Sequence, residues 1–491
     1  MASLKNKAVT SVKLTSISML VTSVLQIAQL LILGRVLGPE IFGLIAMVQI
    51  VIQFSQLFLE MGITDAIIQK EKINKLELSS LYWFSIFVGC VLFLVLFLLA
   101  PAIALMFNEP SLTGMIQVVG ISFIILPFGL QFQTLATKKL EFAQITKNEI
   151  LATTIGVLLT VYLAAFTTLG AWSLVYGHIV MSLFRSVPWV VAGFRNSNTR
   201  PQFVFSWNAI KDFVSFGLYR LGSTSINYFT TKIDQMVVGV MLGPVALGYY
   251  SMAMNLIMQP VQKLNSMINR VAFPVFSKIQ LDQRKLRKTY LLITNMLTSF
   301  NAPLLAGVIV LAPYAVPLLL GEDWGESVLI IQILCLYGLF KALGNPSGSL
   351  FIAVGKVRWS FYWQLFQLGI IPVVVFLAGL SGEIFIVAIA VGLLRMLLFY
   401  VSYYVRIRQI IGDSLRELNL SIAKPVVHSV IMLAFLYLLN SQLTEVGEVG
   451  IIIVDAIIGG LIYGVLLLLN QRELVAEVKG FFRKKTLVKQ V

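Results

Sequence analysis

The chain has 491 residues, of which 58% are hydrophobic and only 12% charged, and its formal net charge is +15. Apolar runs of about 20 residues recur along its whole length, which excludes a water-soluble protein and indicates a polytopic helical membrane protein. The two cysteines lie inside apolar runs and the two histidines are far apart, so we expect no metal site.

The apolar runs predict an all-α fold with about fourteen transmembrane helices. The first run is too long for the apolar core of a signal peptide, so we expect it to remain as the first span. In chain order the expected spans cover residues 12–34, 41–61, 79–102, 113–134, 149–167, 170–192, 214–240, 245–270, 289–312, 326–343, 360–380, 383–403, 424–440 and 449–469.

A segment between the first two spans occurs again between spans 7 and 8. Residues 34–47 read GRVLGPEIFGLIAM and residues 239–252 read GVMLGPVALGYYSM, with six identical positions at an offset of 205. Because the offset corresponds to six spans, it predicts two homologous six-helix lobes with the same orientation. In each copy glycine suits a helix end and proline suits the next first turn, so we expect a tight external hairpin there.

The repeat divides the chain into four parts. We expect an N-lobe of spans 1–6 at residues 1–192, an interfacial linker at 193–213, a C-lobe of spans 7–12 at 214–403, and two further spans with a basic tail at 404–491. The linker mixes aromatic and basic residues, a composition that suits a segment lying on the inner leaflet.

Basic and acidic loop residues separate when the loops are assigned alternately to two sides. One set of loops holds nearly all lysines and arginines, whereas the other holds only Arg35 among several carboxylates. By the positive-inside rule, this pattern predicts that both termini are cytoplasmic. The net charge is then topological and membrane-surface charge, and we do not expect nucleic acid as a partner.

Four spans carry polar residues at intervals that place most of them on one helix face. The stripe of span 1 consists of Thr15, Ser18, Thr22, Gln26 and Gln29, and the equivalent positions of span 7 are Arg220, Ser223, Asn227, Thr231 and Asp234. Spans 2 and 8 carry Gln49, Gln53, Gln56 and Glu60, and Asn255, Gln259, Lys263 and Arg270. Such faces must meet each other or water in a bilayer, so they predict a hydrophilic cavity between the lobes. The alternative is that each side chain only bonds a neighbouring helix.

Charges near the inner ends of these spans predict a cationic mouth to the cavity. They are Lys13, Arg220, Lys263 and Arg270, with Glu60 among them. Such a mouth suits a phosphate-bearing group, although snorkelling alone would also explain Lys13 and Arg270. We expect Arg185 to snorkel from the inner end of its span.

Lys232 and Asp234 lie deeper on span 7, 12 and 14 residues beyond Arg220, or about 18 and 21 Å along the helix. Lys232 is a further candidate for holding the substrate. Asp234, and with it Glu60, is a candidate for coupling transport to H⁺ or Na⁺, the alternative being a structural ion pair.

No phosphate-binding P-loop sequence occurs, and no cytoplasmic loop carries the paired carboxylates that would hold a metal and a sugar nucleotide. The outer loops are also short. We therefore expect neither direct use of ATP nor an enzyme.

The chain resembles a polysaccharide-export flippase of the MOP (multidrug/oligosaccharidyl-lipid/polysaccharide) superfamily, and most of all its Wzx-type, colanic-acid-exporter-like branch. The resemblance lies in the basic start before a polar first span, in GRVLGPEIFGLIAM, and in DQMVVGVMLGP before the second copy. It implies two lobes around a central V-shaped cavity lined by spans 1, 2, 7 and 8, in the bacterial cytoplasmic (inner) membrane. The implied substrate is an oligosaccharide repeat unit on a polyprenyl pyrophosphate, moved by alternating access for exopolysaccharide, O-antigen or capsule export. Membrane lipids and polysaccharide polymerase or export machinery are the implied partners, without a cofactor.

Four other hypotheses stay open. A cation-coupled multidrug exporter agrees with Asp234, but a basic mouth would repel cationic drugs. A peptidoglycan-precursor flippase would also need a basic cavity. A membrane glycan polymerase is disfavoured by the short outer loops, and a scaffold for the synthesis machinery would have no use for polar stripes.

Overall fold

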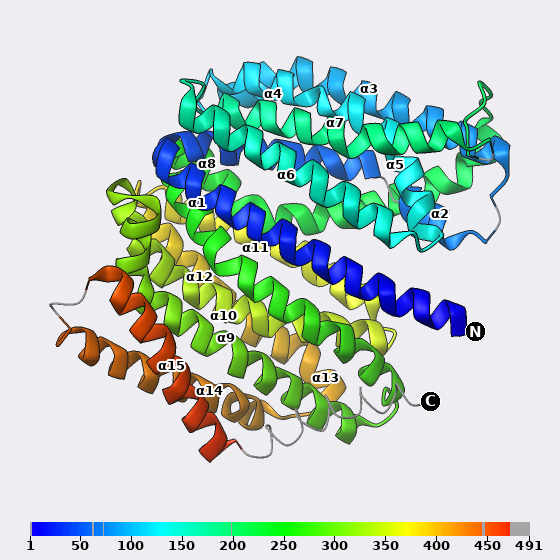
Figure 1. The fold of residues 1–491 in the computed structure, drawn as a ribbon. Helices are drawn as coiled ribbons and strands as arrows, with labels where there is room; N and C mark the ends of the chain where they lie inside the picture. Colours follow the sequence, from blue (N-terminus) through cyan, green and yellow to red (C-terminus); the bar gives the residue numbers. More distant parts are fainter. Residues whose placement is uncertain (1, 61–62, 72, 198, 444–446, 472–491) are drawn as a thin grey trace. The chain divides into compact units, whose positions relative to one another are not determined.

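A computed structural model of the chain describes residues 2–60, 63–71, 73–197, 199–443 and 447–471, with the side chains of residues 2–13, 16, 63, 65–66, 267 and 269–271 left undescribed. The described residues form helices and turns without a strand, which confirms the all-α fold (Figure 1). The helices are α1 (Ala2–Glu60), α2 (Ile63–Gln69), α3 (Lys75–Met106), α4 (Leu112–Gly120), α5 (Ser122–Lys138), α6 (Phe142–Phe166), α7 (Trp172–Arg195), α8 (Trp207–Lys278), α9 (Gln283–Leu320), η1 (Glu322–Trp324), α10 (Gly325–Ala353), α11 (Val357–Gly379), α12 (Ile384–Ser402), η2 (Tyr403–Ile407), α13 (Arg408–Ile411), α14 (Leu415–Asn440) and α15 (Glu448–Asn470).

Twelve helical segments of the described chain are long and apolar enough to cross a membrane. Two of them, Ile17–Glu60 and Trp207–Ser266, have 44 and 60 residues, about twice or more what one crossing needs. Each contains a single glycine with non-helical backbone, Gly38 in α1 and Gly243 in α8. Each of these glycines divides its helix into two legs. With both long segments divided in this way, the described chain has fourteen apolar segments, which is the number of spans that the sequence predicts. The protein is a multi-pass membrane protein, and a complete crossing by each leg stays a prediction.

The two breaks have the same backbone conformation. φ and ψ are 70° and 174° at Gly38, and 80° and −173° at Gly243. A positive φ is readily adopted only by glycine, and proline is tolerated at the first turn of the helical leg that follows. The LGP sequence therefore interrupts the helix in both copies of the repeat, as predicted.

The chain divides into two compact units on either side of the Gly248–Tyr249 bond. The first unit holds α1–α7 and the first leg of α8, and the second holds the remainder of α8 and the helices after it. Within each unit the helices run roughly side by side (Figure 1). The lobes expected from the repeat, at residues 1–192 and 214–403, stay a prediction.

The two copies of the repeated turn touch each other inside the first unit. A Cβ atom placed on Gly43 would lie 1.8 Å from the Pro244 carbonyl oxygen, and one on Gly248 would lie 2.0 Å from the Pro39 carbonyl oxygen. Both distances are far below van der Waals contact, so only glycine fits at either position. Because 43 and 248, like 39 and 244, differ by 205, the contact is reciprocal between equivalent residues.

The first leg of α8 packs along the second leg of α1. Tyr228 Oη donates a hydrogen bond of 2.6 Å to the Ile50 carbonyl oxygen, and the Phe54 ring lies 5.7 Å from the Tyr228 ring and 4.9 Å from the Phe229 ring. Aromatic pairs at such distances add to the energy of burial. These contacts continue the packing of the two helices beyond the close contacts at Gly43 and Gly248.

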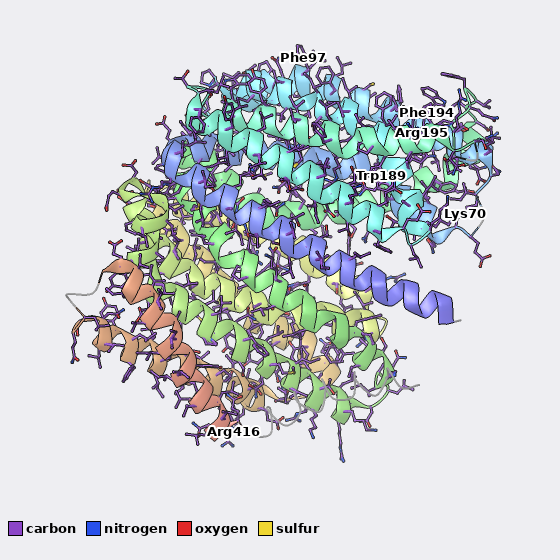
Figure 2. All side chains as sticks on the ribbon, in the orientation of Figure 1. Lys70, Phe97, Trp189, Phe194, Arg195 and Arg416 are labelled. Carbon is purple, nitrogen blue, oxygen red and sulfur yellow. The ribbon has the colours of Figure 1, made fainter. Side chains whose placement is uncertain are left out.

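Lys70, Trp189, Phe194 and Arg195 lie at the same end of the first unit (Figure 2). The Trp189 side chain belongs to a small buried cluster with Tyr82 and Phe132. Basic residues beside aromatic rings are typical of a membrane–water interface. That this end faces the cytoplasm stays a prediction, which rests on the charges of the loops.

The linker between α7 and α8 is tied to the start of α3. The backbone N–H groups of Gln202 and Ser206 donate to Ser79 Oγ and Ser80 Oγ at 3.0 and 2.9 Å. Phe203, which is 92% exposed, stacks on Trp83 with a centroid separation of 4.9 Å. An anchored backbone that presents an exposed aromatic ring suits the interfacial position expected for residues 193–213.

The second unit has a core of its own. One cluster of buried apolar side chains in this unit joins α9, α10 and η2 and includes Leu297, Phe351 and Tyr403. At the start of α9, the Asp282 carboxylate accepts a hydrogen bond of 3.1 Å from Lys285 N, which lowers the pKa of Asp282.

We expect Gly43→Ala to destabilise the protein by about 1–3 kcal/mol, because the new methyl group must displace the Pro244 carbonyl. The measurement is the thermal unfolding temperature of the purified protein. Gly307→Ala is the matched control, since a Cβ there would meet no heavy atom within 4 Å, and helix propensity favours alanine. An unfolding temperature for Gly43→Ala equal to that of the control would contradict the close contact.

Candidate functional site

A cavity of about 430 Å³ lies within the first unit. This volume is within the range of small-molecule sites in proteins. Leucines from α1, α5 and α8 form its apolar lining, and the polar side chains that line it are Gln56, Glu60, Thr64, Gln133, Thr134, Thr137, Arg185, Ser186, Arg220 and Thr224.

Helix periodicity explains why the polar residues reach the cavity from several helices. Residues four apart share a helix face. Gln56 and Glu60 form such a pair on α1, Gln133 and Thr137 form one on α5, and Arg220 and Thr224 form one on α8. Each helix thus turns one polar patch toward the same space.

Close packing of α5 against α7 forms one wall. A Cβ on Gly129 would lie 2.7 Å from Ser186 Oγ, and that hydroxyl donates a hydrogen bond of 2.9 Å to the Ile125 carbonyl oxygen. Asn148 Nδ2 donates to the Arg185 carbonyl oxygen at 2.9 Å, which ties α6 to the same turn of α7. The backbone that carries Arg185 is therefore held from two sides.

The charged lining groups are two guanidinium groups and one carboxylate, those of Arg185, Arg220 and Glu60, so the cavity is formally cationic. An arginine presents several N–H donors in a planar fork that matches phosphate oxygens. The two guanidinium groups therefore provide donors that can bind an anion.

The threonines of the cavity keep their acceptor capacity. Thr134, Thr137 and Thr224 each donate their hydroxyl proton to a carbonyl oxygen one turn earlier, at 2.9, 3.0 and 2.9 Å. A hydroxyl that donates within its helix can still accept a hydrogen bond on its oxygen. With the amides of Gln56 and Gln133, these oxygens can replace water around a sugar.

Three of the residues singled out in the sequence, Gln56, Glu60 and Arg220, meet in this cavity. The second-unit candidates Asn255, Gln259 and Lys263 belong to the other compact unit, and the Lys13 and Arg270 side chains lie outside the described residues. None of the other stripe residues of the first unit lines this cavity, and their role in the larger cavity stays a prediction: Thr15, Ser18, Thr22, Gln26, Gln29, Gln49, Gln53, Ser223, Asn227, Thr231 and Asp234.

Ser18 makes the alternative kind of contact. It is 2% exposed, and its hydroxyl donates a hydrogen bond of 3.1 Å to Glu149 Oε2 on α6. Thr22 Oγ1, one turn later, donates to the Ser18 carbonyl oxygen at 2.7 Å. Ser18 and Thr22 of the α1 stripe thus make hydrogen bonds within their own unit. Helical periodicity shows which residues share a helix face, but not which helix packs against that face.

Arg185 has a role that the sequence did not predict. α7 continues to Arg195, so Arg185 lies ten residues before the end of the helix and lines the cavity, while its snorkelling to the inner surface stays a prediction. The sequence reasoning did not predict that Arg185, Gln133 and Thr137 line a cavity, although the sequence carries two signals for them. One is a charge in the interior of an apolar span, and the other is the polar pair Gln133 and Thr137 at a spacing of four.

Asp234 and Lys232 lie outside this cavity and share a neighbour. Asp234 is 3% exposed, and its Oδ1 accepts a hydrogen bond of 2.9 Å from the Gln235 backbone N–H. Lys232 Nζ donates to Gln235 Oε1 at 3.1 Å. A buried carboxylate in a membrane span is a functional candidate, and its coupling role stays a prediction.

The described residues contain no group of three or more His, Cys, Asp or Glu side chains that could hold a metal ion. The polar and charged groups that line the cavity can bind a ligand by hydrogen bonds and charge.

We expect a cysteine at Thr137 to react rapidly with a charged, water-soluble maleimide, because the cavity is lined by polar groups and admits water. The variant is made after replacing Cys90 and Cys335 by alanine. Thr160→Cys is the control, since Thr160 is 2% exposed between α6 and α7 and should stay unlabelled. Equal labelling of the two positions, measured by mass spectrometry, would rule out a water-filled cavity at Thr137.

Comparison with known proteins gives a consistent result. Residues 32–329 match a family described as polysaccharide biosynthesis protein. Lipopolysaccharide biosynthesis protein WzxC of Escherichia coli (strain K12) is 32% identical over 491 residues, which cover 100% of this chain and 99% of the relative. Teichuronic acid biosynthesis protein TuaB of Bacillus subtilis (strain 168) is 30% identical over 428 residues, 87% of each chain.

The fold is also that of a solved structure. Lipid II flippase MurJ in an inward closed conformation aligns with a TM-score of 0.74 at 14% identity, covering 94% of this chain and 99% of that chain. The likeness shows a common fold, and the sequence relatives confirm the resemblance to the Wzx-type branch. The chain belongs to the polysaccharide biosynthesis protein family.

Proposed function

We propose that this protein is a flippase that moves an oligosaccharide repeat unit, linked to polyprenyl pyrophosphate, across the bacterial cytoplasmic (inner) membrane. Its family is named for polysaccharide biosynthesis, and it shares the fold of a lipid II flippase. The observation that carries the proposal is the cationic cavity, in which Arg185 and Arg220 lie among hydroxyl and amide groups.

The chemistry of the substrate explains why such a cavity is needed. A sugar chain with a pyrophosphate cannot cross hydrocarbon unaided, because its polar groups would lose their hydrogen bonds to water. The two arginines supply charge-assisted hydrogen bonds to phosphate oxygens. Threonine and glutamine side chains supply partners for sugar hydroxyls, while the polyprenyl chain stays in the bilayer.

Transport of this kind changes no covalent bond. The protein alternates between states that are open to one side or the other, and the substrate crosses when the binding site changes its accessibility. We infer that the protein is a transporter and not an enzyme, and that it needs no cofactor. Both termini are cytoplasmic in this proposal, following the distribution of basic loops.

Two related functions differ in substrate. A multidrug exporter for cations is disfavoured by the two arginines of the cavity, which repel positive charge. A peptidoglycan-precursor flippase would use the same contacts to pyrophosphate, so this cavity does not separate it from the proposed function. A comparison of both lipid-linked sugars in one assay separates them.

We expect the variant carrying Arg185→Ala and Arg220→Ala to flip a labelled polyprenyl-pyrophosphate oligosaccharide roughly a hundredfold or more slowly than the wild type, if each contact contributes about 1.5–3 kcal/mol. The measurement is flipping in proteoliposomes. Arg195→Ala, which removes an exposed charge at the end of α7, is the control and should flip at the wild-type rate.

Wild-type rates in the double variant would show that these arginines do not hold the pyrophosphate. Export of cationic drugs by the wild type, without flipping of any lipid-linked sugar, would replace the proposal by the multidrug exporter. A strong preference for the peptidoglycan precursor would reassign the substrate and leave the site in place.

We further propose that Asp234 couples transport to H⁺ or Na⁺. Asp234→Asn keeps the hydrogen-bonding shape but removes the group that binds a cation, so gradient-driven acceleration of flipping should disappear while flipping without a gradient remains. Asp212→Asn, at an exposed position near the start of α8, is the control. An undiminished response to an imposed pH or sodium gradient would contradict the coupling role.

A further inference from the structure

A second cavity, of about 450 Å³, opens on the second unit between α11 and the turn that follows α12. We call it the α11 groove. Its lining includes Trp359, Tyr362, Trp363 and Phe366 of α11 together with Val405 and Arg406 of η2. The groove is thus almost wholly aromatic and aliphatic, with one guanidinium group at its wall.

Arg406 is buried without an acidic partner. It is 6% exposed, and its Cζ lies 4.6 Å from the centre of the Phe351 ring and 4.3 Å from that of the Trp363 indole. Its Nη2 donates to Ser402 Oγ at 2.6 Å, whereas its buried Nε has no hydrogen-bond partner. Among the described residues no carboxylate lies within 4.0 Å of it.

A buried charge is ordinarily paired, because an isolated one is costly to desolvate. Arg395, a second buried arginine among the described residues of this unit, has a hydrogen bond of 2.9 Å to Gln367 Oε1 and lies 5.1 Å from the Tyr337 ring. Arg406 contacts two aromatic rings and one hydroxyl group. Its guanidinium therefore retains capacity for an anion.

The backbone at Arg406 is itself unusual. Residues Tyr403–Ile407 form a π-helical turn at the end of α12. Such turns are rare and occur frequently at functional sites. Here the turn places Val405 on the exposed surface while the next residue is buried against Phe351 and Trp363.

The surroundings suggest what fills the groove. Tyr362 and Phe366 are 65% and 45% exposed, on a helix that is apolar enough to span the membrane. Next to the groove, Lys356 Nζ lies 4.3 Å from the centre of the ring of its lining residue Trp359. Arg408 does not line the groove and is paired with Asp413, with 2.7 Å between Nη2 and Oδ2. Apolar walls beside cations are complementary to a molecule with both an acyl chain and a negative charge.

We propose that the α11 groove binds an anionic phospholipid, with its phosphate on the Arg406 guanidinium and the upper part of an acyl chain along Trp359, Tyr362 and Phe366. This site belongs to the second unit and is separate from the cationic cavity, so it does not depend on the proposed transport function. Arginine forms its strongest hydrogen bonds with phosphate where water is excluded, as it is between two aromatic rings.

The test uses the full-length protein, purified in detergent and delipidated. Its unfolding temperature is measured with dioleoylphosphatidylglycerol, with dioleoylphosphatidylcholine, and with inorganic phosphate alone. We expect phosphatidylglycerol to raise the unfolding temperature by a few degrees and the other two to raise it far less. The rise should disappear in Arg406→Gln and persist in Arg408→Gln, which removes a neighbouring exposed guanidinium.

Equal stabilisation by both lipids, or an unchanged rise in Arg406→Gln, would overturn the proposal. Stabilisation by inorganic phosphate as large as that by phosphatidylglycerol would show that the site takes a free anion and not a lipid.

A second measurement does not require the Arg406 variant to fold. Phosphatidylglycerol with brominated acyl chains should quench wild-type tryptophan fluorescence more than brominated phosphatidylcholine does. This excess should be lost when Trp359 and Trp363 are both replaced by phenylalanine, which preserves an aromatic groove. An excess that survives the replacement would place the lipid elsewhere and reject the α11 groove.

Discussion

The reciprocal contact between the two LGP turns is the constraint on which the first unit depends. Gly43 meets the carbonyl oxygen of Pro244, and Gly248 meets that of Pro39, at distances that leave no room for a side chain. This contact fixes the second leg of α1 against the first leg of α8, and the Tyr228–Ile50 hydrogen bond continues it. The same two helices carry Glu60 and Arg220 into the cavity, so its polar lining follows from the close approach of the backbones.

A charged side chain is costly inside a bilayer, and four arginines of this protein are accommodated in three ways. Arg185 and Arg220 line a cavity that polar groups keep suitable for water or a substrate. Arg395 is satisfied internally by Gln367 and Tyr337. Arg406 lies between aromatic rings at the edge of a groove. The environment of each guanidinium, and not its presence in a span, separates the proposed substrate site from a structural contact and from the proposed lipid site.

Sequence periodicity predicted the polar faces but not their neighbours. Gln56, Glu60 and Arg220 line one cavity, whereas Ser18, on an equally regular stripe, is buried against Glu149. The spacing of three and four residues is the same in both cases, since it reflects only the helical turn. Arg185 shows the converse, because its position in the interior of α7 became clear only once the length of the helix was known.

The sequence by itself determined the membrane class, the apolar segments, the repeat and the glycine breaks, because hydrophobicity, helical period and the conformational freedom of glycine are local properties. Only the tertiary structure decided that α5 and α7 contribute Gln133, Thr137 and Arg185 to the cavity, and that Arg406 lies between two rings. These arrangements join helices that are far apart along the chain. No local pattern encodes which faces meet, since that depends on how all the helices pack together.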